Sequence, residues 1–73
     1  MKLIVTDFKD NSEVLNIDLT STNGLVKCDK TPQYKTYEFM IKPALKQINK
    51  QVFSGVFRDD DTSPIYATWN FYA

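Results

Sequence analysis

The 73-residue sequence contains no histidine, only one cysteine and only two glycines. Without histidine the chain lacks the usual general base near neutral pH and the commonest metal ligand, and no Ser/His or Cys/His nucleophilic pair can form. Gly24 and Gly55 lie too far apart to build a Gly-rich phosphate-binding loop. We therefore expect no enzymatic activity, no cofactor and no bound metal. The one catalytic arrangement left open is a carboxylate pair, with Glu38 or Asp18 facing a second acid, but so small a core has little room for a pocket.

The single cysteine, Cys28, cannot form an intramolecular disulfide. Small secreted domains usually depend on disulfides for stability, so their absence favours a reducing, cytoplasmic setting. No stretch of the sequence approaches the roughly 20 apolar residues of a membrane-spanning helix. We expect a single cytoplasmic domain over residues 1–73, because a chain of this length has room for one core.

Basic and acidic residues are equal in number, nine of each, so the formal net charge is zero. A dedicated duplex-DNA binder usually carries a basic excess, so that class becomes less favoured. The charges are nevertheless unevenly distributed, since residues 32–54 are basic and residues 55–73 are acidic. Such a separation can steer a charged partner even at zero net charge.

Alternating apolar and polar residues predict several short strands. The clearest is 14–20, where Leu15, Ile17 and Leu19 share one face. Asn23-Gly24 is a strong hairpin signal, because a type I′ turn needs positive φ at both central residues. Together these patterns predict six strands, at residues 2–8, 14–20, 25–29, 34–41, 56–58 and 65–72.

The hydrophobic period changes after residue 41. Pro43 can occupy the first turn of a helix, and Ala44, Leu45, Ile48 and Val52 then follow at helical spacing. We predict a helix near residues 43–53. The fold class is therefore α+β, a small and mostly antiparallel sheet or partly closed barrel of about five to six short strands with one helix packed on it.

Asp59, Asp60 and Asp61 form the most concentrated charge in the chain. An EF-hand loop beginning at Asp59 would need glycine at its sixth position and glutamate at its twelfth, where this sequence has Pro64 and Asn70. That calcium site is excluded, although loose magnesium binding stays open. The triplet fits either an exposed acidic turn or an acidic surface that meets basic groups of a partner.

Ten aromatic residues are more than so small a core requires. Phe8, Phe39, Phe53, Phe57, Trp69 and Phe71 are expected in the core because they fall on the apolar faces of the predicted elements. Tyr34, Tyr66 and Tyr72 fall on polar faces, and half-exposed tyrosines are typical of recognition surfaces.

Lys42, Lys46 and Lys50 recur at four-residue intervals and would form one basic stripe along the predicted helix. Such a stripe is usually the solvated side of an amphipathic helix. With the nearby tyrosines it could instead bind a single-stranded nucleic acid, because bases stack on aromatic rings while lysines contact phosphates.

The sequence favours a small non-enzymatic interaction module that docks on a larger protein as an inhibitor or regulator, and we expect a phage or plasmid source. The predicted partner-binding residues are Tyr34, Lys42, Lys46, Lys50, Asp59, Asp60, Asp61, Tyr66 and Tyr72. Two alternatives stay open: a single-stranded nucleic-acid-binding protein with a Lys/Tyr surface, and a homodimer paired through an edge strand at residues 65–72.

Overall fold

The computed structural model describes residues 1–73 and contains six strands and two helices. In chain order these are β1 (Lys2–Asp7), β2 (Glu13–Asp18), β3 (Thr20–Thr22), β4 (Leu25–Lys27), α1 (Pro32–Thr36), α2 (Glu38–Ile48), β5 (Ser54–Phe57) and β6 (Ala67–Tyr72). The α+β class is confirmed. The sheets are not closed, so the barrel form of the prediction is not the one adopted.

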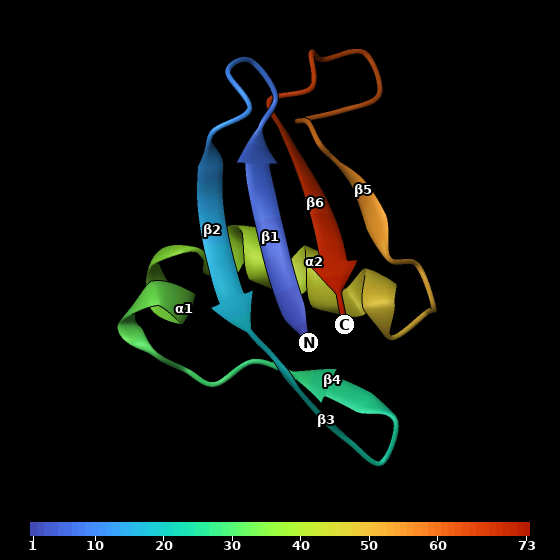
Figure 1. The fold of residues 1–73 in the computed structure, drawn as a ribbon. Coiled ribbons are helices and arrows are strands. Elements are labelled where there is room, and N and C mark those ends of the chain that lie inside the picture. The colour runs from blue at the N-terminus through green and yellow to red at the C-terminus, as the bar shows by residue number, and fades with distance from the viewer.

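Four strands form one antiparallel sheet in the order β2-β1-β6-β5 (Figure 1). β1 pairs with β2 on one side and with β6 on the other, and Lys2 lies opposite both Asp18 and Tyr72. The chain therefore places its first and last strands side by side in the middle of the sheet. β6 has neighbours on both sides, so the prediction that residues 65–72 are an edge strand is wrong.

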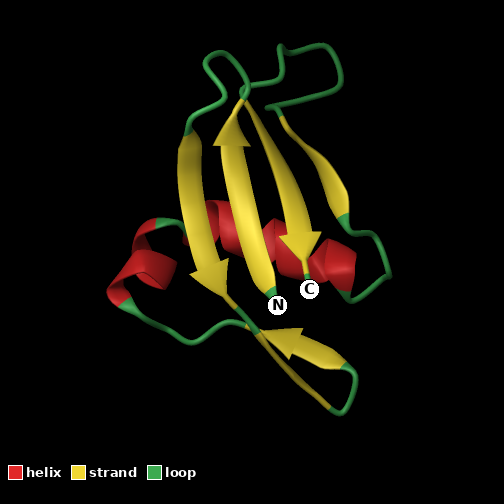
Figure 2. Ribbon diagram, viewed as in Figure 1, coloured by secondary structure: helices red, strands yellow, loops and turns green.

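The hydrophobic core lies between one face of this sheet and α2, which crosses behind the strands (Figure 2). Leu3 and Val5 from β1 and Leu15 and Ile17 from β2 point into it, as their alternation predicts. From α2, Ile41 and Ala44 are fully buried against these side chains. The opposite face of the sheet has no helix over it (Figure 1).

On the core face, the indole of Trp69 in β6 lies directly over Gly55 in β5. A side-chain Cβ placed at Gly55 would lie 2.6 Å from Cε2 and 2.8 Å from Nε1 of the Trp69 indole, and closer still to Cζ2. The indole therefore occupies space that only glycine leaves free. Trp69 also makes an edge-to-face contact with Phe71, with ring centroids 5.6 Å apart.

The region predicted as a fourth strand, 34–41, is helical. Thr31 caps α1, because its Oγ1 accepts a hydrogen bond from the backbone N–H of Tyr34 at 3.2 Å, and Pro32 occupies the first turn. The main helix also begins earlier than predicted, at Glu38, and ends at Ile48 rather than near residue 53. Pro43 lies inside α2 rather than at its start.

Pro43 is tolerated inside α2 because it lies on the exposed side of the helix. Proline has no N–H to donate, so the carbonyl of Phe39, four residues earlier, loses its helical partner. Phe39 is also exposed, and water can satisfy that carbonyl.

The Asn23-Gly24 turn is confirmed, with φ of 54° and 80° at its two residues. The strands that it joins are shorter than predicted, since β2 ends at Asp18 and the turn connects β3 to β4 in a separate two-stranded sheet. The side chain of Asn49, just after α2, binds this hairpin: its Oδ1 accepts from the N–H of Val26 at 3.0 Å, and its Nδ2 donates to the carbonyl of Val26 at 3.4 Å.

Three of the six aromatic residues expected in the core are instead exposed: Phe8, Phe39 and Phe53. Phe57 and Trp69 are buried and Phe71 is half-buried. Phe39 points outward because it lies in a helix, where alternation with Ile41 does not place the two side chains on one face.

No helix of this protein is both long and apolar enough to cross a bilayer.

Candidate interaction surfaces

The loop end of the sheet carries most of the negative charge. Two connections lie together there, the β1–β2 turn and the segment that joins β5 to β6 (Figure 1). Residues 7–13 and 58–66 contain six acidic and two basic side chains. By contrast, residues 27–50, which include both helices, contain six basic and two acidic side chains. The folded chain therefore has an acidic end and a basic helical region, as the sequence indicates.

A hollow of about 570 Å³ lies at the acidic end. It is lined by Asp7, Phe8, Lys9, Pro64, Ile65 and Tyr66. Phe8 is 55% exposed and Tyr66 is 44% exposed. The backbone N–H of Phe8 donates to the carbonyl of Tyr66 at 3.1 Å, which continues the β1–β6 ladder and holds the two aromatic residues opposite each other. We refer to these six residues as the Phe8–Tyr66 hollow.

Tyr66 is further positioned by contact with the core. Its ring stacks on that of Phe57, with centroids 6.3 Å apart and an interplanar angle of 18°. Phe57 is itself buried, so one side of Tyr66 packs against a fixed surface while the rest is accessible. The prediction that Tyr66 is half-exposed is confirmed, and the ring loses little further entropy when a partner covers it.

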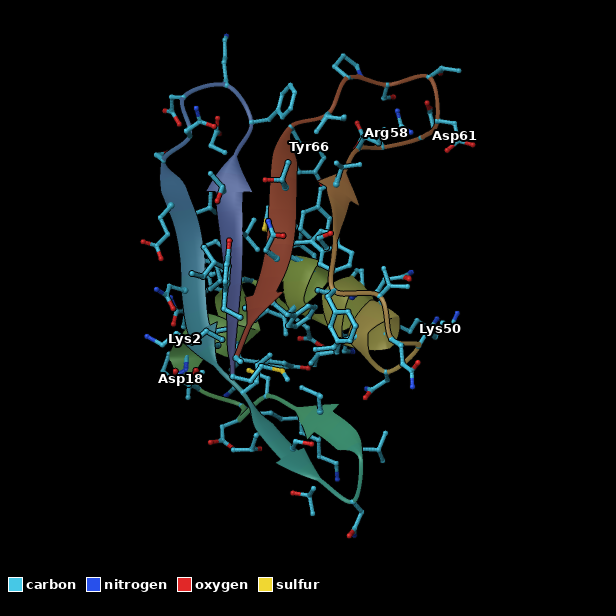
Figure 3. The ribbon with its side chains drawn as sticks, turned by 45° about the vertical axis from the view of Figure 1, so that its right-hand side comes forward. Lys2, Asp18, Lys50, Arg58, Asp61 and Tyr66 are labelled. Atoms are coloured by element: carbon cyan, nitrogen blue, oxygen red, sulfur yellow. The ribbon has the colours of Figure 1, made fainter.

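The acidic triplet Asp59–Asp61 lies earlier in the loop that leads to the hollow, and one of its aspartates organises that loop. Oδ1 of Asp60 accepts from the backbone N–H of Thr62 at 2.8 Å, from the Thr62 hydroxyl at 2.7 Å and from the Ser63 hydroxyl at 3.0 Å. The hydrogen bonds from the Thr62 hydroxyl and backbone, and then from Ser63, lower the pKa of Asp60 below its ordinary 3.8. Asp59 and Asp61 are exposed beside it, and Asp61 projects at the rim of the loop (Figure 3).

The three aspartates do not assemble a metal site. No group of three or more His, Cys, Asp or Glu side chains in the protein converges on one point. With Asp60 committed to Thr62 and Ser63, the triplet is an acidic turn in which one carboxylate is structural and two remain available to a partner.

The outer side of α2 forms a second surface, which is basic with one exposed aromatic ring. Phe39 is 62% exposed. A shallow hollow of about 550 Å³ is lined by Lys35, Thr36, Glu38, Phe39, Lys42 and Pro43. Lys46 lines a neighbouring hollow, which shares Lys42 and Pro43 with the first one. We call this the Phe39–lysine surface.

Part of its positive charge is neutralised within the helix. Nζ of Lys42 lies 2.6 Å from Oε1 of Glu38, one helical turn earlier. The hydrogen bond between them, followed by the attraction of opposite charges, lowers the pKa of Glu38 and raises the pKa of Lys42. Lys35 and Lys46 have no such ion pair, and they carry the free charge of this surface. Lys50 follows the end of the helix and lies toward β5 (Figure 3).

Tyr34 was wrongly predicted to lie on a recognition surface. It is 7% exposed and belongs to the core, because residue 34 lies in α1 and not in a strand. Tyr72 is exposed, as predicted, but on the face of the sheet opposite α2, since Ala67 and Trp69 of the same strand are buried toward the helix. The lysines of α2 and the exposed tyrosines therefore lie on different sides of the molecule, and the predicted Lys/Tyr groove does not form.

Two exposed aromatic residues on these surfaces were not predicted, Phe8 and Phe39. Phe8 follows the last residue of β1, where the turn residues Asp10-Asn11-Ser12 begin close by. The alternation of β1 was the available signal, because Leu3 and Val5 mark the odd-numbered positions as the core face and residue 8 falls on the other face. The signal for Phe39 was Thr31-Pro32, which is a typical helix start. It predicts helix and not strand in the residues that follow, where the structure has α1 and α2.

Cys28 is half-buried, and burial, with a contribution from the charge of Asp29, raises the pKa of its thiol above 9.0. The reactive thiolate form is therefore scarce at neutral pH.

None of the protein-family models, curated proteins and solved structures compared with this chain matches it.

Proposed function

We propose that this protein is a non-enzymatic module that docks on a larger protein, as an inhibitor or regulator, through its acidic end. The observation that carries this proposal is the Phe8–Tyr66 hollow, in which two half-exposed aromatic rings flank an apolar depression. Aromatic anchors around a desolvated centre are the residues that dominate protein–protein binding energies. The partner's complementary site carries a protruding apolar side chain surrounded by basic residues.

Three further features support this proposal. Asp59 and Asp61 are exposed in the same loop that supplies Pro64 and Ile65 to the hollow, and their charge would raise the rate of encounter with a basic partner at low salt. The chain has no histidine, and its polar groups form no cluster around a buried pocket. A single cysteine and no disulfide fit action in the cytoplasm.

Site-specific photocrosslinking tests the proposal. A photoreactive phenylalanine analogue is placed at Phe8, at Tyr66 or at Phe39, and each variant is irradiated in cells that express the chain. We expect positions 8 and 66 to give the same adduct with one protein. Position 39 is the matched control, since it is also an exposed aromatic residue but lies on the basic side.

The captured partner then allows a quantitative test. Tyr66→Ala removes an anchor, and a loss of about 2 kcal/mol, or roughly 30-fold in affinity, is typical for such a residue. The double variant with Asp59→Lys and Asp61→Lys should also weaken binding, and the loss of affinity should be larger at low salt than at high salt. An adduct that forms equally from position 39, or a partner whose affinity survives Tyr66→Ala, contradicts docking through the acidic end.

A second candidate function is supported by the Phe39–lysine surface. An exposed ring between lysines resembles the platforms on which single-stranded nucleic acids stack their bases. The test is titration of a fluorescent single-stranded oligonucleotide at two salt concentrations with wild type, Phe39→Ser and Lys46→Glu. Binding that weakens with salt and in both variants supports this function, whereas absent or salt-insensitive binding excludes it.

A further inference from the structure

β5 is an unprotected edge of the sheet. It pairs only with β6, and the carbonyls of Phe53 and Phe57 accept hydrogen bonds from the N–H groups of Phe71 and Tyr66. Because bonding direction alternates along an antiparallel strand, the backbone groups of Ser54 and Val56 point outward. This edge offers unpaired N–H and C=O groups to another strand.

The sequence of this edge has none of the usual protection against strand addition. Residues 51–57 contain no charge and no proline, and Val52, Phe53 and Val56 are all exposed. Natural edge strands are normally kept single by charged side chains, prolines or bulges. The unprotected edge is therefore suited to pairing with a further strand.

We propose that a second copy of this chain pairs antiparallel along β5, so that two four-stranded sheets join into one continuous sheet. A two-fold axis at Gly55 satisfies the outward groups, because Ser54 then exchanges both backbone hydrogen bonds with the partner's Val56, and Val56 with the partner's Ser54. The same register sets the exposed Phe53 opposite the partner's Phe57 on the core face. Cross-strand aromatic pairs of this kind stabilise antiparallel sheets.

Charge complementarity selects a second copy as the occupant. Lys50 precedes β5 and the Asp59–Asp61 loop follows it, and both project at the outer edge of the strand at its opposite ends (Figure 3). In the antiparallel arrangement the end of β5 that follows Lys50 lies beside the end of the partner's β5 that leads into Asp59–Asp61, so each Lys50 lies on the same side as the partner's acidic loop. The acidic loop outweighs the single Arg58 beside it.

The other edge of the sheet lacks this complementarity. β2 begins at Glu13 and ends at Asp18, both exposed, so an antiparallel copy of β2 would bring carboxylates together at each end of the interface. β1 also shows a register irregularity against β2 between Val5 and Thr6. Of the two edges of this sheet, β5 is therefore the one suited to self-pairing.

Sedimentation velocity of the full chain between about 5 μM and 1 mM tests the proposal. We expect the mass to rise with concentration from 8.5 kDa toward twice that value. Hydrogen exchange at the N–H groups of Ser54 and Val56 should slow in the concentrated sample only. Val56→Lys, on an exposed position, should remain at 8.5 kDa, whereas Phe39→Lys, at another exposed apolar position but on α2, should dimerise like wild type.

Charge reversal provides an independent test that leaves the strand untouched. Lys50→Glu or Asp61→Lys should each raise the dissociation constant of the dimer by roughly tenfold, and the double variant should restore it. Asp61 is the choice because Asp60 holds its own loop together. This comparison remains decisive even if Val56→Lys melts at a lower temperature than wild type.

A chain that stays at 8.5 kDa up to 1 mM overturns the proposal and leaves the β5 edge to an extended segment of a different protein. A dimer that persists in Val56→Lys, or that shows no rescue in the double charge reversal, overturns it as well, because it must form through another surface. Neither result depends on whether the acidic end docks on a larger protein.

Discussion

Substitution of Gly55 by alanine tests how closely β5 packs on Trp69. The added Cβ would overlap the indole, with separations of 2.6 Å from Cε2 and 2.8 Å from Nε1. Overpacking of this kind typically costs 1–3 kcal/mol, because side chains or backbone must shift to make room. The same substitution restricts the unfolded chain, which returns about 0.4–1 kcal/mol. A net loss of about 1.5 kcal/mol is expected.

For a domain of this size, each kcal/mol corresponds to roughly 4–8 °C in Tm, so Gly55→Ala should melt about 6–12 °C below wild type. Trp69 is the only tryptophan, and its fluorescence reports both the melting transition and any displacement of the ring. The emission maximum of the folded variant should move to longer wavelength if the indole shifts toward solvent.

A double-mutant cycle assigns the cost to the indole itself. Trp69→Phe removes the part of the ring that overlaps the new Cβ, so Gly55→Ala should cost at least 1 kcal/mol less in that background. Circular dichroism provides the measurement, since the double variant has no tryptophan. An unchanged Tm for Gly55→Ala, or an equal loss in both backgrounds, would refute the steric argument.

Three further predictions concern the core, the hairpin and the acidic loop. Tyr34→Ala should destabilise the fold by about 3 kcal/mol in chemical denaturation because the ring is buried, whereas Tyr34→Phe should melt close to wild type. Asn49→Ala should cost about 1 kcal/mol and speed hydrogen exchange at the N–H of Val26, which it binds. Asp60 has a lowered pKa in the folded state, so its contribution is complete above about pH 3.8 and is lost as the pH falls through the folded value. An acid melting series should show a smaller loss of Tm in Asp60→Asn than in wild type, with the remainder coming from Asp10 and Glu38, whose pKa values are also lowered.

The strands were predictable where one face of the sheet is covered. In β1, β2 and β6 one face lies against the helix and the other faces solvent, so apolar and polar residues alternate. In β2, Leu15 and Ile17 therefore indicate both the strand and its buried face. The same alternation was misleading at Tyr37, Phe39 and Ile41. Tyr37 and Ile41 are four residues apart and also fit a helical spacing, whereas Phe39 does not, and the packing of Ile41 and Ala44 on the sheet favours the helix.

The candidate surfaces were predictable in charge but not in aromatic content. Charged side chains stay solvated in almost any fold, so the acidic loop and the lysines of α2 lie at the surface as expected. An aromatic ring gives no such guarantee, because it serves equally in a core or at an interface. Tyr34 is buried and Phe39 is exposed, the reverse of the prediction, because both residues lie in helices and not in a strand. Composition alone could not have indicated this.

The position of β1 and β6 in the middle of the sheet has a consequence for how the molecule folds. β1 with β2, and β5 with β6, are hairpins that can close early because each involves residues close in sequence. The two hairpins join only along β1 and β6, where Lys2 meets Tyr72 from the far end of the chain. Closing so long a loop carries an entropic penalty before its contacts stabilise anything. We expect β1–β6 docking to limit the folding rate, with α2 stabilising it only once both hairpins lie against the helix.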